Sequence, residues 1–491
     1  MANKRYIKYK FSIPFSISLG IVLIFISLFY SSCKKFVQID APTSSITTSE
    51  TFSDSADANA AIMGIYANMI NTGNPEFSSG AITIYCGLSA DELINFNNDN
   101  DLNQLYTNAV LAPNGNVYLD LWNKAYPIIY QANACIEGLQ ASSGIATLTK
   151  NQFIGEAKFI RALCYFYLVN LFGDVPYISS IAWEQSSVAS RTSKDEIYQN
   201  IIADLKDAQM FLRSDYSIAG GERIRANQFA ATALLARVYL YTRDYVNAES
   251  QSSGVINNTV TYSLDSDLNS VFLKNSSEAI LQWGLNPPNA SLGNLTPEGY
   301  GLVANSATSQ PHYYLTQQLL NGFEQGDQRK VAWIDSTTYD LDNIKYYYPY
   351  KYKLGNAQFT GADATEYYMV LRLAEQYLIR SEARAEQGND LSGAISDLNV
   401  IRKRAGLPDL PASLTPAQIL TAVAQERRIE FFAEWGHRWL DLKRTGQIDA
   451  VMSIITPQKN GGGVWNSYQQ LYPIPFGELS LDPNLTQNTG Y

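Results

Sequence analysis

The sequence predicts a mostly α-helical protein in which pairs of helices support a loop-rich, partly β insert. Three observations lead to this prediction: long apolar stripes with the helical repeat, two helix–turn–helix segments of similar spacing, and a stretch of more than a hundred residues with neither feature. The composition is that of a globular protein, because 46% of the 491 residues are apolar and 17% are charged.

Two stretches carry the helical repeat most clearly. In "GEAKFIRALCYFYLVNLFG" (155–173), apolar side chains recur every three or four residues and form one stripe on a helix. The stretch "ANQFAATALLARVYLYTRDY" (226–245) has the same spacing. Because such a stripe needs an apolar partner, we expect both helices to lie in the core.

Each predicted helical pair has an Ala-rich first helix, a short turn and a second helix. Tyr245 begins the second helix of one pair. In the other, Gly388 ends the first helix, Asn389 or Asp390 caps the next, and Gly406 ends that one. The pairs resemble tetratricopeptide-type pairs, although the spacing between copies is irregular.

Another long helix is predicted over 413–446. Thr415 suits the N-cap, Pro416 the first helical position and Gln418 the capping box. Residues 251–365 differ, because they are rich in Asn, Ser, Gly, Pro and Tyr and contain short β-prone runs such as "AILQWGL". Long irregular segments on rigid scaffolds commonly hold binding surfaces.

The first 33 residues have the pattern of a lipoprotein export signal. A basic start is followed by an uncharged, mostly apolar run over 11–30, and Ser31 and Ser32 precede Cys33, the predicted site of lipid attachment. The alternative is a membrane-spanning helix, since the run is long enough to cross a bilayer. Cleavage before Cys33 would change the net charge from −10 to −14, because it removes four positive charges and no negative ones.

The charge balance excludes nucleic acid as an expected partner. Lys and Arg total 36 against 46 Asp and Glu, so no basic face is available to replace counterions. The remaining cysteines, Cys86, Cys135 and Cys164, are widely spaced and odd in number. We expect buried single thiols rather than disulfides or a zinc site.

Several segments, in this order, carry a family resemblance: "GEAKFIRALCYFYLVNLFGDVPY", "AATALLARVYLYTRDYVNAE", "LRLAEQYLIRSEARAEQG", "ERRIEFFAEWGHRWLDLKRTG" and "LYPIPFGELSLDPNLTQNTGY". Together with the lipoprotein start, they resemble the SusD/RagB family of Bacteroidota outer-membrane lipoproteins. The resemblance covers essentially the whole mature chain. It divides the chain into a signal peptide (1–32), an N-terminal helical region (33–250), a loop-rich variable segment (251–365) and a C-terminal helical region (366–491).

The resemblance implies a binding protein rather than an enzyme. Such proteins are lipid-anchored at the cell surface, carry four tetratricopeptide-like helix pairs, and act as a lid over a SusC-type TonB-dependent outer-membrane transporter. They capture glycans or, in the RagB branch, peptides. No cofactor is implied.

Most motifs of known enzymes are absent from the sequence. The two histidines, His312 and His437, are 125 positions apart, so an H-E-x-x-H zinc site is excluded. His437 lies in a segment that the resemblance makes structural. A pair of carboxylates for glycoside hydrolysis stays open as an alternative, because 46 acids could place two close together.

Aromatic side chains among amides are the candidate ligand contacts, because sugar rings stack on aromatic faces and their hydroxyls bond to amides. Phe96 and Asn98 lie in a predicted exposed loop, "INFNNDND". Trp283 follows an apolar run, and a buried strand is the alternative. Tyr313 and Tyr314 are expected to begin a helix with one of them buried, and Trp333 is a similar candidate.

The run "IKYYYPYKYK" (344–353) raises the question of why so many tyrosines adjoin. On a strand, Tyr346, Tyr348, Tyr350 and Tyr352 would share one face, which we interpret as mainly architectural. Tyr347 points the other way and is the candidate ligand contact. Three tryptophans on periodic or family-like helices are expected in the core: Trp122, Trp435 and Trp439.

The charged residues of the family-like segments are expected to form salt bridges between helices. They are Arg161, Glu375, Arg427, Arg438, Asp441 and Arg444. The acidic run at 97–101 superficially suggests calcium, but it lacks the glycine and the distal glutamate of an EF-hand loop. We therefore predict no metal site and no catalytic residue, and a glycan ligand with peptide capture or hydrolysis as alternatives.

Overall fold

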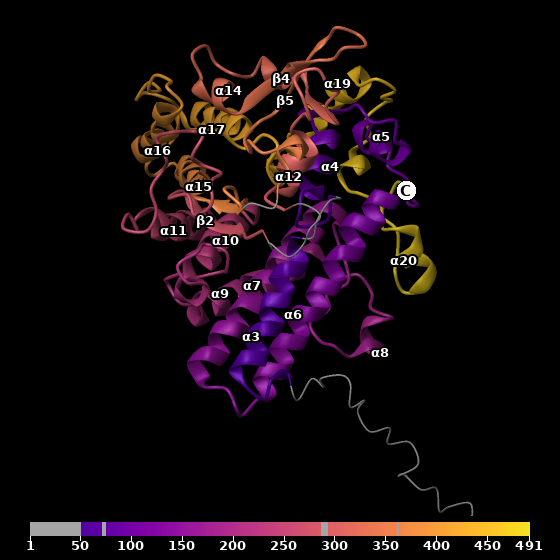
Figure 1. Cartoon of the computed structure of the whole chain (residues 1–491), viewed down its shortest axis with the longest axis vertical. Coiled ribbons are helices and arrows are strands. Elements are labelled where there is room, and N and C mark those ends of the chain that lie inside the picture. The colour runs from indigo at the N-terminus through magenta and orange to yellow at the C-terminus, as the bar shows by residue number, and fades with distance from the viewer. Residues whose placement is uncertain (1–50, 71–74, 286–292, 361–362) are drawn as a thin grey trace, which may run out of the picture. The chain divides into compact units, whose positions relative to one another are not determined.

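The computed structural model describes residues 51–70, 75–285, 293–360 and 363–491 (Figure 1). The predicted signal segment and Cys33 lie outside these residues. Within the described ranges, none of the helices combines the length and the hydropathy needed to cross a bilayer.

Helix α7 is the centre of the N-terminal helices. It spans Thr147–Phe172, and nearly every side chain beyond its first turn is buried. It packs against α6 (Asn123–Ala141) and α9 (Lys194–Phe211), while α3 (Ser55–Met69) contacts both α6 and α7. The predicted core position of this helix is confirmed.

The two predicted helical pairs are confirmed. They are α10 (Gln228–Tyr241) with α11 (Tyr245–Ile256), and α15 (Leu373–Gln387) with α16 (Leu391–Arg404). Gly388 ends α15 with a φ of 69°, and the Asp390 side chain caps α16. Neighbouring helices pack in succession, α7 on α9, α9 on α10, α10 on α11 and α11 on α15, as Figure 1 shows. The fold is therefore mostly helical and tetratricopeptide-like, as predicted.

The helix predicted over 413–446 is interrupted, which corrects the sequence interpretation. Thr415 and Gln418 form the expected capping box, but α17 (Pro416–Glu430) ends well before α18 (His437–Arg444). Ala433, Trp435 and Gly436 between them have φ of 50°, 45° and 68°. This turn inserts Trp435, whose backbone N–H donates to Thr83 Oγ1 and whose indole N–H donates to Met369 O, each at 2.7 Å.

The variable segment is partly β, as predicted. Strand β2 (Ala279–Trp283) pairs antiparallel with β6 (Tyr368–Arg372), with a register shift along the pair. Two further antiparallel pairs are β1 (Leu93–Asn95) with β3 (Tyr313–Leu315), and β4 (Ile334–Thr338) with β5 (Lys345–Pro349).

Short helices complete the chain. The α-helices are α4 (Ala81–Ser89), α5 (Asn100–Tyr106), α8 (Trp183–Ser186), α12 (Pro297–Leu302), α13 (Gln317–Leu320), α14 (Gln328–Ala332), α19 (Ile448–Ile455) and α20 (Phe476–Leu481). The π-helix η1 is Val117–Trp122, and the 3-10 helices η2 to η5 are Ser217–Ala219, Asn356–Gln358, Thr456–Gln458 and Ser467–Gln470. The described residues from 51 onward pack as one compact unit, and the boundaries at 250 and 365 stay predictions.

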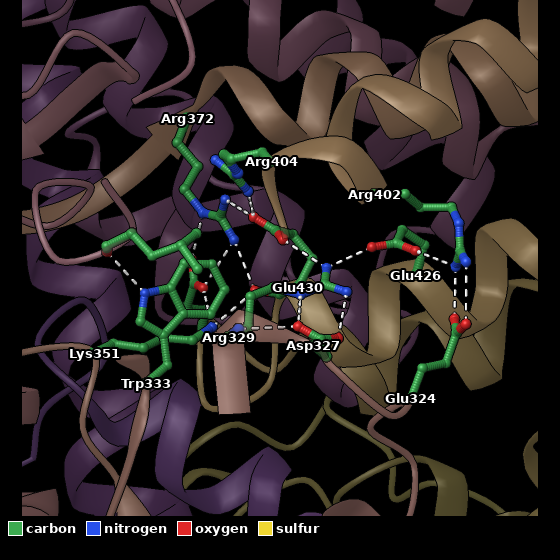
Figure 2. Close-up of polar contacts among 12 residues, drawn as sticks. Glu324, Asp327, Arg329, Trp333, Lys351, Arg372, Arg402, Arg404, Glu426 and Glu430 are labelled. Atoms are coloured by element: carbon green, nitrogen blue, oxygen red, sulfur yellow. Dashed lines mark hydrogen bonds and ion pairs between the residues drawn. The ribbon is translucent and has the colours of Figure 1, made fainter. Parts of the chain in front are cut away.

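A buried network of charges joins the variable segment to the C-terminal helices (Figure 2). Arg329 of α14 bonds Glu430 of α17 at 2.9 Å, and Arg372 of β6 bonds the same carboxylate at 2.6 Å. Arg404 of α16 reaches it as well. Burial alone would raise the pKa of Glu430, but the three guanidinium groups outweigh it and hold that pKa well below its usual range.

The other structural predictions for charged and core residues are confirmed. Salt bridges between helices are Arg161–Asp204, Arg237–Glu375, Arg427–Asp441 and Arg444–Glu382, while Arg438 pairs with Asp91 in the turn after α4. Trp122, Trp435 and Trp439 are buried. Cys86, Cys135 and Cys164 are buried free thiols, and burial raises the pKa of the Cys86 thiol to about 12.

Candidate functional site

Four aromatic side chains from three separate parts of the chain meet in one half-buried cluster. Phe96 follows β1, Tyr314 lies in β3, Tyr346 lies in β5, and Tyr339 lies in the turn between β4 and β5. Figure 1 places the β4–β5 hairpin and α12 in the same part of the molecule as α4 and α5. The cluster is therefore built by strand pairing, since β3 contacts both β1 and β5.

Phe96 is the centre of this aromatic cluster. Its ring centroid lies 4.9 Å from that of Tyr346, 5.5 Å from Tyr314 and 6.1 Å from Tyr339. Tyr314 and Tyr346 are themselves 4.9 Å apart. The interplanar angles run from 59° to 80°, so the rings form an uneven aromatic surface rather than one flat platform.

Amide and imidazole groups hold the loop that carries Phe96. The Phe96 N–H donates to His312 O at 3.0 Å, and Gln310 donates its side-chain amide to Phe96 O at 3.3 Å. Asn97 Oδ1 lies 3.1 Å from His312 Nδ1, and Asn95 Oδ1 accepts from the Asn97 N–H. The aromatic cluster therefore has a polar rim whose amides can both donate and accept.

A small pocket adjoins this rim. It has a volume of about 250 Å³, and it is lined by Pro75, Asn97, Pro297, Tyr300, Gly301, His312 and Tyr313. Asn97 and His312 thus belong both to the support of Phe96 and to the pocket wall. A ligand that rests on the aromatic cluster could place a polar group in this pocket.

The phenol groups of Tyr314 and Tyr346 are neutral hydrogen-bonding groups at physiological pH. Burial and the hydrogen bond to Asp342, 2.8 Å long, raise the pKa of Tyr346 to about 12. Burial also raises the pKa of Tyr314. Neutral rings with polar edges suit the stacking and hydrogen bonding of a hydroxyl-rich ligand.

The structure brings some of the predicted ligand residues together. Phe96 and Tyr314 are in the cluster, Tyr313 lines the adjoining pocket, and Asn98 is exposed beside Asn97. The predicted helix start at Tyr313 is wrong, because these two tyrosines pair with β1 and helix α13 begins only at Gln317. One of the two is buried, as expected.

Tyr347 lies outside the aromatic cluster, while its neighbour Tyr346 lies inside it. Tyr347 is 37% exposed, and the Lys345 ammonium lies 5.3 Å from its ring centroid. Tyr348 and Tyr352 are buried, so the architectural interpretation of the tyrosine run is correct for them. Tyr346 was missed as a candidate because strand alternation alone does not show that its face meets Phe96 at the edge of the core.

The structure corrects the predicted ligand contacts at Trp283 and Trp333, because both side chains are almost completely buried. Trp283 ends β2 and is 1% exposed, with Tyr66 at a centroid distance of 5.7 Å. Trp333 is fully buried, its indole N–H donates to Leu268 O at 2.9 Å, and the Lys351 ammonium lies 4.8 Å from its ring centroid.

The acidic run at 97–101 has structural roles. Asp99 caps α5 by accepting from the Leu102 N–H at 2.9 Å, and Asp101 accepts from the Gly115 N–H at 2.7 Å. In the part of the chain that the structure describes, no three His, Cys, Asp or Glu residues are grouped to hold a metal ion.

His437 has the surroundings of a structural residue. It is 6% exposed, its ring packs on Phe431 at a centroid distance of 4.7 Å, and its Nδ1 lies 3.3 Å from Arg427 Nη2. Burial and the nearby positive charges, chiefly Arg237 and Arg427, lower the pKa of His437 well below its usual range. A neutral, enclosed imidazole is poorly placed to act on a ligand.

Comparison with known proteins agrees with the fold and the sequence motifs. The model of the "SusD family" matches residues 294–491, and that of "Starch-binding associating with outer membrane" matches residues 42–240. This chain therefore resembles the SusD/RagB family in both its N-terminal and its C-terminal part.

Two relatives match most of this SusD-like chain. "SusD-like protein P2" of Formosa agariphila is 27% identical, over 90% of this chain and 93% of its own. "Starch-binding protein SusD" of Bacteroides thetaiotaomicron is 24% identical, over 74% of this chain and 76% of its own. A SusD superfamily crystal structure from Bacteroides vulgatus has the same fold, with a TM-score of 0.78, 23% identity and coverage of 90% and 100%.

Proposed function

We propose that this SusD-like protein captures a glycan on the aromatic cluster of Phe96, Tyr314, Tyr339 and Tyr346. The observation that carries the proposal is the meeting of these four rings beside an amide rim and a small pocket. A relative named for starch binding supports a sugar as the ligand. Binding here involves stacking and hydrogen bonds, with no bond made or broken.

We further propose that the protein is anchored in the outer membrane through Cys33 and hands its ligand to a SusC-type TonB-dependent transporter. The family description, which names association with the outer membrane, supports the location. In the native bacterium, Cys33→Ala should move the chain out of the membrane fraction, and the unmodified chain should co-purify with such a transporter. If the mutant chain stays in the membrane fraction, the proposed lipid anchor at Cys33 is wrong. If no such transporter co-purifies with the unmodified chain, the proposed transporter partner is wrong.

The ligand is tested by calorimetry of the chain from Lys34 onward, which retains all the described residues of the compact unit. A panel of polysaccharides, oligosaccharides and a peptide digest is titrated, and each mixture is then analysed for shortened products. We expect one glycan class to bind and to be recovered intact. If only peptides bind, the protein is a peptide-binding member instead of a glycan-binding one. If shortened products appear, the protein is a hydrolase.

The site is tested with Phe96→Ala and Tyr346→Ala. Each should weaken glycan binding about tenfold, because one aromatic contact contributes roughly 0.5–1.5 kcal/mol beyond its buried area and Phe96 also holds its neighbours. Trp183→Ala is the matched control, since Trp183 of α8 is a 69% exposed aromatic outside the cluster. Equal affinity in all three variants would place the glycan elsewhere.

A further inference from the structure

A cavity of about 450 Å³ lies where the end of α7, the start of α9, the α10–α11 turn and α18 come together. Its wall includes Gly173, Lys194, Arg243 and Lys443, one from each of these places. It shares no lining residue with the aromatic cluster or with the pocket beside it. The cavity therefore belongs to a separate part of the surface, and glycan capture does not account for it.

The cavity wall is strongly basic in a chain whose net charge is −10. Five cationic side chains line it, against the single carboxylate of Asp174: Arg191, Lys194, Arg243, Lys443 and Arg444. Arg444 is neutralised by Glu382 and Asp441. Within the described ranges, none of the other four cations has a carboxylate oxygen within 4.0 Å.

Neutral acceptors hold Arg191 in place without neutralising its charge. Arg191 donates to three backbone carbonyls, the nearest being Asp174 O at 2.7 Å, and to the side-chain oxygen of Asn488. The Asp174 carboxylate accepts from the Lys194 backbone N–H at 2.8 Å and so is committed to the start of α9. The Arg191 side of the wall is thus held in place, and the cavity keeps a surplus of positive charge.

Lys443 is the side chain that an anion would stabilise most. Among the described residues, its ammonium has one hydrogen-bond acceptor, the backbone carbonyl of Asn170, so two of its three N–H bonds are free for a ligand. Burial, together with the positive charge of Lys194, lowers the pKa of Lys443 to about 7. Two ammonium groups that repel each other across a cavity favour an anion between them.

We propose that this cavity binds a doubly charged oxyanion, which is either free phosphate, free sulfate or a phosphate ester of a small molecule. Four cations without carboxylate partners suit a dianion better than a single carboxylate, because each can donate a charge-assisted hydrogen bond to a separate oxygen. The volume exceeds that of the ion alone and falls in the range of small-molecule sites, so an attached group can be accommodated.

The proposal is tested by calorimetry of the chain from Lys34 onward with inorganic phosphate, inorganic sulfate and glucose 6-phosphate. Acetate and glucose serve as controls for charge and for the sugar. We expect saturable binding of at least one dianion and weaker binding of acetate. Tighter binding of glucose 6-phosphate than of inorganic phosphate identifies a small-molecule ester as the ligand, whereas equal or tighter binding of the inorganic ions identifies the free ion as the ligand.

The site is tested with Lys194→Gln and Arg243→Gln, both of which change exposed side chains and so should leave the fold intact. Each should weaken dianion binding about tenfold, as expected for the loss of one hydrogen bond to a charged group. Lys206→Gln is the matched control, because Lys206 is an exposed lysine farther along the same helix. Absence of saturable dianion binding, equal affinity for acetate, or equal affinity in all three variants would overturn the proposal. None of these outcomes depends on the glycan experiment.

Discussion

Glu298 shows how burial sets the charge of a single residue in this molecule. It is 2% exposed in α12, and its carboxylate accepts hydrogen bonds from the Thr83 hydroxyl of α4 and, at 3.0 Å, from the Tyr368 hydroxyl of β6. Burial, with a smaller effect of Glu434, raises the pKa of Glu298 to about 8. Helix α12, which carries Tyr300 to the pocket beside the aromatic cluster, is therefore fastened by an acid that is largely protonated at pH 7.

We expect Glu298→Gln to stabilise the protein at pH 8 and to change its stability little at pH 4.5. The native state of the unmodified protein binds one more proton than the unfolded state between these values, so its stability falls as pH rises through this window. Glutamine keeps the acceptor oxygen but does not titrate. The gain at pH 8 should be about 3–5 kcal/mol, taking roughly 1.4 kcal/mol for each pKa unit.

The measurement is urea unfolding of both proteins at pH 4.5, 6 and 8. Glu184→Gln, which changes an exposed acid in α8, is the control and should show no such pH-dependent difference. A Glu298→Gln protein that is equally or less stable at pH 8 would contradict the assignment of a raised pKa.

At the scale of elements, one glycine ends helix α15 and another precedes helix α18. The two have the same left-handed backbone conformation but different neighbours. Gly388 after α15 has a φ of 69°, and Gly436 before α18 has a φ of 68°. A Cβ added at Gly388 would have no neighbour within 4 Å, whereas one at Gly436 would lie 2.6 Å from Cys86 Cβ. Of the two, only Gly436 is also needed for the close packing of α18 against α4.

This difference predicts unequal costs for the same substitution. Gly388→Ala should destabilise the protein by roughly 1–2 kcal/mol, the cost of a left-handed backbone for a residue with a Cβ. Gly436→Ala should cost roughly 1–3 kcal/mol more, since overpacking adds to the same strain. Thermal unfolding of the two variants side by side measures the difference. An equal loss of stability in both would show that the α4–α18 contact can move apart to accommodate the added methyl group.

At the scale of the whole molecule, buried charges connect segments that are distant in sequence. Arg372 of β6 bonds Glu278 before β2, Glu430 of α17 and Glu434 in the turn after α17, at 2.9, 2.6 and 2.9 Å. Lys351, which follows β5, also reaches Glu434 and donates to Glu430 O. As Figure 2 shows for part of this network, the variable segment is fastened to the C-terminal helices through shared carboxylates.

Removing the central cation should therefore be costly. We expect Arg372→Met to destabilise the protein by roughly 3–5 kcal/mol, because it leaves buried carboxylates without a partner. Lys274→Met breaks the Lys274–Glu222 pair, whose side chains are 40% and 33% exposed, and should change stability by about 1 kcal/mol or less. Urea unfolding compares the two, and similar values would mean that the network tolerates an unpaired carboxylate.

The sequence by itself determined the features that local spacing encodes. The apolar stripes of α7 and α10, the Gly388 and Asp390 boundary and the Thr415 capping box each depend on residues a few positions apart. The ordered motifs were sufficient to predict the family. Phe96 could be selected as a candidate because it is an aromatic residue among asparagines in a predicted exposed loop.

The tertiary structure alone decided which aromatic side chains meet. Phe96 and Tyr346 come together because β1 pairs with β3 and β3 contacts β5, contacts that no local pattern records. Trp283 and Trp333 look equally suitable in sequence, but the β2–β6 pairing and the contacts of Leu268 and Lys351 bury them. The basic cavity arose in the same way, because its cations come from separate helices and loops. Exposure and convergence depend on long-range packing, and for that reason the binding surfaces could not be located from spacing along the chain.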